Sequence, residues 1–241
     1  MYQPRTYRQW SATEDLVSFR VVAGETDLLI RAGSDLSDKA LEAVKTCRAG
    51  LEDYIRKHPF FAVSLGPIGV EDSAPALVRD MAAAAQAAGV GPMAAVAGAI
   101  AREVGTSLLQ FSEEVIVENG GDIYIRSSRP RLVGLYAGES PLTGKVAFLI
   151  RPEDTPLGVC TSSGTVGHSI SFGLADAAAA FSPSAALADA AATAIGNRVR
   201  TAEDIPGAIE FAKRVPGLTG VAIVKGDVLG VWGRVQLARV Q

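Results

Sequence analysis

The sequence predicts an α+β protein in which helices pack on antiparallel sheets. Strand-like runs flank short turns containing Gly and Asp in three places, AGETDLLIR, NGGDIYIR and VKGDVLGV. Helical patterns cover 36–58 and 74–104, and apolar residues mostly repeat with strand spacing from 114 to 181. The repeated strand–turn–strand pattern is compatible with a duplicated unit. Because no linker or low-complexity run interrupts the 241 residues, we expect 1–241 to form a single domain.

The first part of the chain is expected to contain one hairpin followed by helices. The elements expected are a hairpin over 16–32, helices over 36–58, 74–88 and 92–104, and an extended segment over 60–68. The uncharged stretch Met81–Ala101 approaches the length of a membrane span. It is mostly Ala and Gly, however, and Gly89-Val90-Gly91-Pro92 interrupts it. We therefore predict two short helices packed in a core and no membrane partner.

The second part of the chain is expected to be rich in strands. The strands expected cover 114–118, 122–126, 132–137, 145–150, 158–162, 166–171 and 176–181. Helices are expected over 184–197, where Ser184 can cap the first turn, and over 203–215. A last hairpin is expected over 218–232.

Composition narrows the class of protein and its surroundings. Hydrophobic residues make up 48% of the chain and charged residues 20%, as in globular domains. The net charge of −3 offers no basic field for a phosphate backbone, so we expect no nucleic-acid partner. No signal peptide is recognisable, and Cys47 and Cys160 lack metal-ligand spacing. These observations favour a cytoplasmic protein with free thiols.

The stretch GVCTSSGTVGHS, residues 158–169, is the part of the sequence densest in reactive side chains. One reading pairs Cys160 as a nucleophile with His168 as its base, if a hairpin brings them together. A second reading is a phosphate cradle, in which small residues let backbone N–H groups approach an anion. Its donors would be Thr161, Ser162, Ser163 and Gly164. The third reading is a polar turn between two strands with a buried cysteine.

Two further patterns indicate a ligand site. Asp189 and Thr193 stand four residues apart on a predicted helix, so their oxygens share one face. Such a pair can hold Mg²⁺, which takes few protein oxygens, although Asp189 can equally serve as a helix-capping residue. Asn119-Gly120-Gly121-Asp122 predicts a tight hairpin turn whose glycines would also let a ligand approach the backbone.

These pieces, taken in order, resemble the FAD:protein FMN transferases, the ApbE-like proteins. VENGGDIYI is similar to their N-x-G-G-D-I turn, CTSSG to their T-S-G stretch, and LADAAATA to their A-D-A-x-A-T-A helix. The whole chain resembles a soluble branch related to these enzymes. The resemblance implies a T-fold-like, duplicated α+β unit with an FAD pocket. It also implies an enzyme that splits FAD and, with Mg²⁺, attaches FMN to a Thr or Ser of a target protein.

The resemblance also suggests a role for each candidate residue. Asp189, Thr193 and the backbone carbonyl of Ala94 match the metal positions, and His168 matches the catalytic histidine. Asn119, Gly120, Gly121 and Asp122 would line the cofactor pocket together with Thr161, Ser162, Ser163 and Gly164. The sequence departs from the family where Ala95 replaces a lysine and where only one histidine of a pair is present.

Three functions follow from these observations. The first is a Mg²⁺-dependent flavin or nucleotide transferase with an altered substrate. The second is a non-catalytic protein that keeps the fold and binds a nucleotide or a protein partner. The third is a structural subunit of a homo-oligomer, because Ala- and Gly-rich helices allow close packing.

Overall fold

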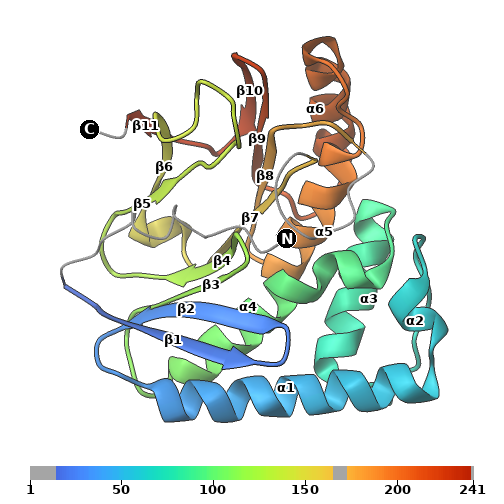
Figure 1. Cartoon of the computed structure of the whole chain (residues 1–241), viewed down its shortest axis with the longest axis vertical. Coiled ribbons are helices and arrows are strands. Elements are labelled where there is room, and N and C mark those ends of the chain that lie inside the picture. The colour runs from blue at the N-terminus through green and yellow to red at the C-terminus, as the bar shows by residue number, and fades with distance from the viewer. Residues whose placement is uncertain (1–14, 165–172, 240–241) are drawn as a thin grey trace.

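A continuous eight-stranded antiparallel sheet forms the centre of the protein (Figure 1). The structure is a computed structural model and describes residues 15–164 and 173–239. The strand order is β1-β2-β3-β4-β7-β8-β9-β10. The strands are Val17–Ala23 (β1), Thr26–Ala32 (β2), Val115–Asn119 (β3), Asp122–Arg126 (β4), Leu157–Ser162 (β7), Ala177–Ser182 (β8), Gly220–Lys225 (β9) and Val228–Gly233 (β10).

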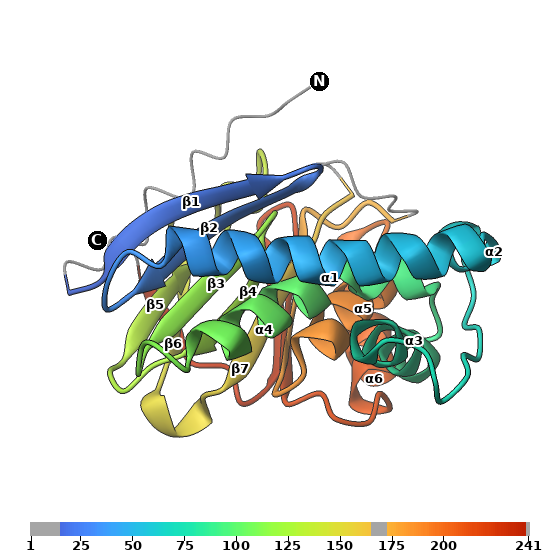
Figure 2. The same cartoon turned by 90° about the horizontal axis from the view of Figure 1, so that it is seen from below.

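Helices cover one face of this sheet, with the long α1 lying across its β1–β2 end (Figure 2). The α-helices are Ser37–Lys57 (α1), Phe60–Val63 (α2), Ala76–Ala88 (α3), Val96–Leu108 (α4), Ala185–Gly196 (α5) and Ile205–Lys213 (α6). Short 3-10 turns are Pro92–Ala95 (η2), Pro152–Asp154 (η3) and Ala202–Asp204 (η4). The larger apolar core lies between these helices and the sheet.

A three-stranded sheet covers part of the opposite face (Figure 1). Its strands, in the order β11-β6-β5, are Leu237–Arg239 (β11), Val146–Ile150 (β6) and Arg131–Gly134 (β5). A second, smaller core lies between the two sheets, where the Phe148 and Phe181 rings meet edge to face with centroids 4.9 Å apart.

The two halves of the large sheet share one connectivity. In the first half, hairpin β1–β2 is followed by helices and then by hairpin β3–β4, with β2 against β3. In the second half, β7–β8 is followed by helices and then by β9–β10, with β8 against β9. The halves join where β4 pairs antiparallel with β7, so that Ile123 lies opposite Val159. The α+β class with antiparallel sheets is therefore confirmed.

Most expected elements are present, and three expectations need comment. The extended segment expected over 60–68 is wrong, because Phe60–Val63 forms a helical turn that buries Phe61 against Tyr54. Strand β11 was not expected from its three residues. The strand expected over 166–171 lies outside the described residues.

The apolar stretch 81–101 does form two helices, as the sequence predicts. No single described helix is long and apolar enough to cross a membrane. Residues Ala76–Ala88 and Pro92–Leu108 reach that length and apolarity only when they are taken together, and the two segments are bent by 104° at the break between them. Most of the large side chains of α3 and α4 lie in the core beneath the sheet.

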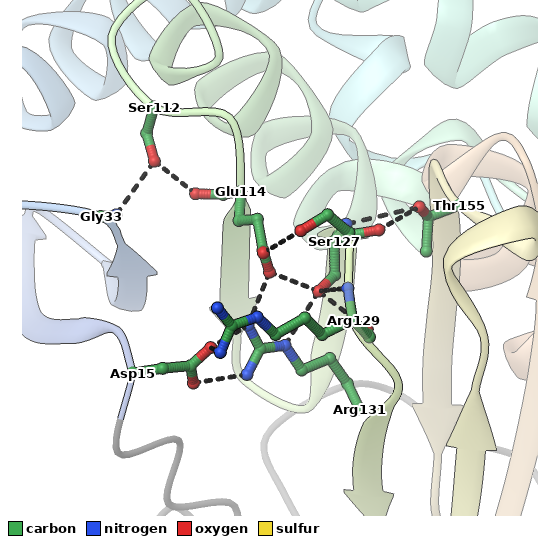
Figure 3. A network of polar contacts seen from close by, with 9 residues as sticks. Asp15, Gly33, Ser112, Glu114, Ser127, Arg129, Arg131 and Thr155 are labelled. Carbon is green, nitrogen blue, oxygen red and sulfur yellow. Dashed lines mark hydrogen bonds and ion pairs between the residues drawn. The ribbon is translucent and has the colours of Figure 1, made fainter.

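A polar network joins the two sheets at the start of β5 (Figure 3). The Arg131 guanidinium donates to both carboxylate oxygens of Asp15, at 2.7 and 2.8 Å, and to Glu114 at 2.6 Å. Its Nε donates to the Ser127 hydroxyl at 2.9 Å. Although burial opposes its charge, hydrogen bonds from Ser127, Ser128 and Arg131 lower the pKa of Glu114 to about 2.

Candidate functional site

Acidic side chains gather where the two halves of the large sheet meet. Asp122 is the first residue of β4 and lies beside β7, the first strand of the second half. Its Oδ1 accepts a hydrogen bond from the backbone N–H of Thr161, at 3.2 Å, and its carboxylate also interacts with the Cys160 thiol. Asp122 is only 8% exposed, so the joint between the halves holds a buried carboxylate.

Helix α5 brings a second carboxylate to this joint. Its first residue, Ala185, packs so tightly on β7 that a Cβ added to Gly158 would lie 2.4 Å from the Ala185 Cα. The Cys160 thiol donates to the Ala185 carbonyl at 3.4 Å. One turn further along α5, Asp189 is 9% exposed and interacts electrostatically with Asp122.

Asp189 also links α5 to the first turn of α4 by a hydrogen bond. Its Oδ2 accepts a hydrogen bond from the Gly98 N–H at 2.8 Å, and the amide of Ala97 also stabilises its charge. The alternative that Asp189 caps its own helix is wrong, because the first turn of α5 contains no acidic residue. Its carboxylate instead accepts from the first turn of α4. Asn119 supports the same turn from β3, because its Nδ2 donates to the Ala97 carbonyl at 3.1 Å.

Burial makes the charge of both carboxylates costly. It raises the pKa of Asp189 to about 7, although the amides of Gly98 and Ala97 oppose the rise. Burial also raises the pKa of Asp122 well above its usual range, and the charge of Asp189 adds to that rise. No Lys or Arg among residues 15–164 and 173–239 stabilises either carboxylate. A pair of this kind needs a proton or a cation between its members.

The geometry of Cys160 argues against the nucleophile reading. The side chain is fully buried, and its thiol is held between Asp122 and the Ala185 carbonyl. Burial, together with the charges of Asp122 and Asp189, raises the pKa of Cys160 well above the ordinary thiol value, so the reactive thiolate is disfavoured. His168, its suggested base, lies outside the described residues.

The remaining residues of the CTSSG stretch follow the end of β7. The N–H of Thr161 donates to Asp122, and the N–H of Gly164 donates to the Ala175 carbonyl at 2.9 Å. These two amides therefore already have acceptors within the protein. Ser162 is buried, whereas Ser163 is half-buried and Gly164 is exposed.

The turn Asn119-Gly120-Gly121-Asp122 is a tight hairpin, as expected. Gly120 and Gly121 both have positive φ, 67° and 109°, which other residues rarely adopt. The N–H of Gly121 donates to Glu118 Oε1 at 2.8 Å, so a carboxylate stabilises the turn from within. Among the residues that the structure describes, a Cβ added to Gly121 would meet only the Thr161 carbonyl oxygen, at 3.9 Å.

The residues proposed to hold a metal come from elements that touch one another. Ala94 lies in η2, which packs against α5, and Thr193 follows Asp189 by one turn on α5. The donors are a carboxylate, a hydroxyl and a carbonyl, all hard oxygens of the kind Mg²⁺ prefers. The described residues contain no group of three or more His, Cys, Asp or Glu side chains that could hold a metal. The oxygen set nevertheless fits Mg²⁺, because the cation takes few carboxylates and keeps several waters.

Gly98 is a residue of this site that the sequence did not reveal. A Cβ there would lie 2.3 Å from the Ala185 carbonyl oxygen and 2.9 Å from the Asp189 Cβ. The signal was present in the sequence as a glycine within an otherwise helix-favouring run, VAGAIA. Its meaning depends on which helix crosses it, and only the fold provides that information.

Replacing Gly98 with Ala is therefore expected to push α4 away from α5. The clash should cost about 1–3 kcal/mol of unfolding free energy and weaken the Gly98–Asp189 hydrogen bond. Urea unfolding followed by circular dichroism measures this cost. Gly50→Ala on α1 is the control, because nothing lies within 4 Å of a Cβ at that position. Equal stability of the two variants would contradict the close helix crossing.

Comparison with known proteins places the chain in a family. Residues 8–214 match the protein-family model described as "AbpE bacteria". The chain belongs to this family. It is also 44% identical to the UPF0280 protein of Methanocaldococcus jannaschii over 222 residues, which cover 90% of each chain. The UPF0280 protein of Methanopyrus kandleri is 43% identical over 91% of each chain.

Solved structures of ApbE proteins share the fold of this family member. The flavinyl transferase ApbE of Pseudomonas stutzeri, in its apo form, superposes with a TM-score of 0.58 over 90% of this chain and 94% of its own, at 13% identity. The ApbE protein of Thermotoga maritima gives a TM-score of 0.56 at 14% identity, over 89% of this chain and 96% of its own. At such identities the likeness concerns the fold, which is the ApbE fold.

Proposed function

We propose that this ApbE-family protein is a Mg²⁺-dependent transferase that splits FAD and attaches the FMN part to a Ser or Thr hydroxyl of a target protein. In this reaction the pyrophosphate bond of FAD breaks and a phosphoester bond forms to the hydroxyl oxygen. AMP leaves, and the hydroxyl proton passes to a base. The fold shared with a flavinyl transferase supports the reaction class.

Each side chain of the site has a proposed task. Asp189, the Thr193 hydroxyl and the Ala94 carbonyl would hold Mg²⁺, which would neutralise charge on the pyrophosphate when bound. The Gly120–Gly121 turn and the hydroxyls of Thr161, Ser162 and Ser163 would position the nucleotide. His168 is proposed as the base that removes the proton of the incoming hydroxyl.

One observation carries this proposal. Asp122 and Asp189 are two buried carboxylates at the joint of the sheet, and the described residues supply no cation to either. A bound divalent cation would compensate that charge and turn a costly arrangement into a binding site. Since Ala95 replaces a family lysine, a nucleotide other than FAD remains a candidate substrate.

Calorimetric titration of FAD, FMN, ATP and ADP, with and without Mg²⁺, tests the proposal. We expect wild-type protein to bind FAD or another of these nucleotides only when Mg²⁺ is present. Asp189→Asn should weaken that binding about tenfold or more, because a metal ligand is lost. Asp80→Asn is the control, since this carboxylate lies on α3 and pairs with Arg102 away from the joint.

The remaining outcomes separate the alternatives. Binding without Mg²⁺ would favour a non-catalytic binding protein with the same fold. The absence of binding by all four nucleotides would contradict the flavin proposal and leave a structural role in an oligomer ahead. Where FAD binds, transfer itself is tested by covalent flavin fluorescence on a Ser- or Thr-containing acceptor protein.

A further inference from the structure

We propose that Asp122 is a second carboxylate ligand of the divalent cation, so that each half of the large sheet supplies one acidic side chain. This inference rests on the proposed function, because it concerns the cation of the same site. Sequence resemblance assigns the cation to Asp189, Thr193 and Ala94 and leaves Asp122 in the flavin pocket. The contacts around Asp122 argue for the cation instead.

The direction of the Asp122 side chain is the first argument. Side chains two residues apart on a strand point to the same face of a sheet. Tyr124 belongs to the core on the helical face. Its ring packs closely on α4, because a Cβ added to Gly105 would lie 2.3 Å from the ring. Asp122 therefore points to the face that carries α4 and α5.

A short chain of contacts then connects Asp122 to Asp189. Asp122 interacts with the Cys160 thiol, and that thiol donates to the Ala185 carbonyl at 3.4 Å. Ala185, Asp189 and Thr193 follow one another at four-residue intervals, so they lie on one face of α5. That face meets β7 at Gly158, which places Asp189 and Thr193 over the same joint as Asp122.

The remaining acceptor capacity of the two carboxylates is the second argument. Asp122 Oδ1 accepts the Thr161 N–H and Asp189 Oδ2 accepts the Gly98 N–H, so the protein itself holds both side chains in place. A carboxylate has two oxygens and about four lone-pair directions, and further acceptor sites therefore remain on each side chain. Both side chains are held in place by the protein, carry oxygen ligands and are more than nine-tenths buried. These are the properties of carboxylates that bind a cation together.

Charge is the third argument. Neither carboxylate receives a Lys or Arg from the described parts of the chain, whereas the largely buried Glu114 side chain is paired with Arg131. Two adjacent buried carboxylates without a cation can also share a proton. The two explanations differ in one measurable respect, because only ligation makes metal affinity depend on Asp122.

Titration with Mn²⁺ alone, in place of Mg²⁺, tests the proposal on the full chain. Electron paramagnetic resonance reports the free Mn²⁺ directly and needs neither nucleotide nor activity. We expect Asp122→Asn to lower Mn²⁺ affinity about tenfold or more, as Asp189→Asn does. Asparagine keeps an acceptor for the Thr161 N–H, so the hairpin should remain folded.

Glu118→Gln is the matched control. It removes a buried acid from the same hairpin whose charge acts weakly on Asp122, so this variant measures the effect of charge alone. Glu118 stands two residues from Ile116 on β3 and therefore faces the other side of the sheet. We expect its Mn²⁺ affinity to stay within about threefold of wild type, because charge alone acts weakly through the sheet. An equal loss in Glu118→Gln and Asp122→Asn would show a general charge effect and overturn the assignment.

A measurement on wild-type protein covers the case in which Asp122→Asn does not fold. Fe²⁺ bound in place of Mg²⁺, with ascorbate and peroxide, cleaves backbone close to the metal. Cleavage near residue 122 as well as near 189 is expected, whereas cleavage near 189 alone would overturn the proposal. Loss of affinity in Asp189→Asn but not in Asp122→Asn would also overturn it and leave the proposed function standing. If wild type binds no Mn²⁺, the metal-dependent function itself fails.

Discussion

Replacement of Arg131 by Met is expected to destabilise the protein by about 3 kcal/mol, because it leaves a buried carboxylate without its cation. The Arg131 side chain is 7% exposed and holds Glu114, whose side chain is 12% exposed, as well as Asp15 (Figure 3). Methionine keeps most of the apolar volume, so the loss should come from the ion pairs. Chemical unfolding at neutral pH measures the free-energy difference.

Two variants make this expectation specific. Arg129→Met is the control, because Arg129 is exposed and its side chain reaches only Asp15, at 3.3 Å, among residues 15–164 and 173–239. We therefore expect a loss below about 1 kcal/mol. Adding Glu114→Gln to Arg131→Met should recover part of the stability, since the unpaired charge is removed. If the double variant were as unstable as the sum of the single ones, Glu114 and Arg131 would not be coupled.

The lowered pKa of Glu114 also predicts how stability changes with pH. A carboxylate whose folded pKa lies below its unfolded value contributes stability above the unfolded value and loses it as the pH falls. For Glu114 this interval runs from about 4.5 down to about 2. Acid unfolding in this range should therefore be less steep in Arg131→Met than in wild type.

The second large effect is a change of stability with pH that comes from Asp189, and its direction is opposite to that expected for Glu114. Its folded pKa, about 7, lies above the ordinary 3.8, so the protonated side chain is favoured in the folded protein. This contribution is fully present below about pH 3.8 and is lost as the pH rises to about 7. Without metal, wild type should lose as much as about 4 kcal/mol of stability over this range.

Asp189→Asn should remove the Asp189 part of this pH dependence, because asparagine does not titrate, and leave the part that comes from the buried Asp122. Unfolding free energies in metal-free buffer at pH 5 and pH 8 give the comparison, with Asp38→Asn on the exposed side of α1 as the control. Addition of Mg²⁺ at pH 8 should restore stability to wild type but not to Asp189→Asn. A wild-type stability that does not change between pH 5 and pH 8 would contradict the raised pKa of Asp189.

Local sequence patterns are sufficient to predict most of the helices and strands. The turns at Gly24 and Gly120–Gly121 need positive φ, and glycine at those positions identified both hairpins. Ser184 accepts from the Leu187 N–H and begins α5 where the cap was expected. Phe60–Val63 was misjudged because an apolar run of four residues suits a strand as well as a helical turn, and only the contact with Tyr54 selects the turn.

The candidate site could be predicted residue by residue but not as an arrangement. The helix spacing of Asp189 and Thr193 and the Gly-Gly turn before Asp122 were visible in the sequence. That Asp122 and Asp189 share one buried space depends on the pairing of β4 with β7 and on the approach of α5 to Gly158. These contacts are non-local, and no short pattern encodes them.

The joint between β4 and β7 has a consequence for how such a protein can diverge. If the two similarly connected halves arose from one ancestral gene segment, the border between β4 and β7 would have formed only when that segment was copied. The composite site would then be younger than the unit that was copied. Either copy could later vary its outer strands, but substitutions at the shared border would have to suit both copies at once.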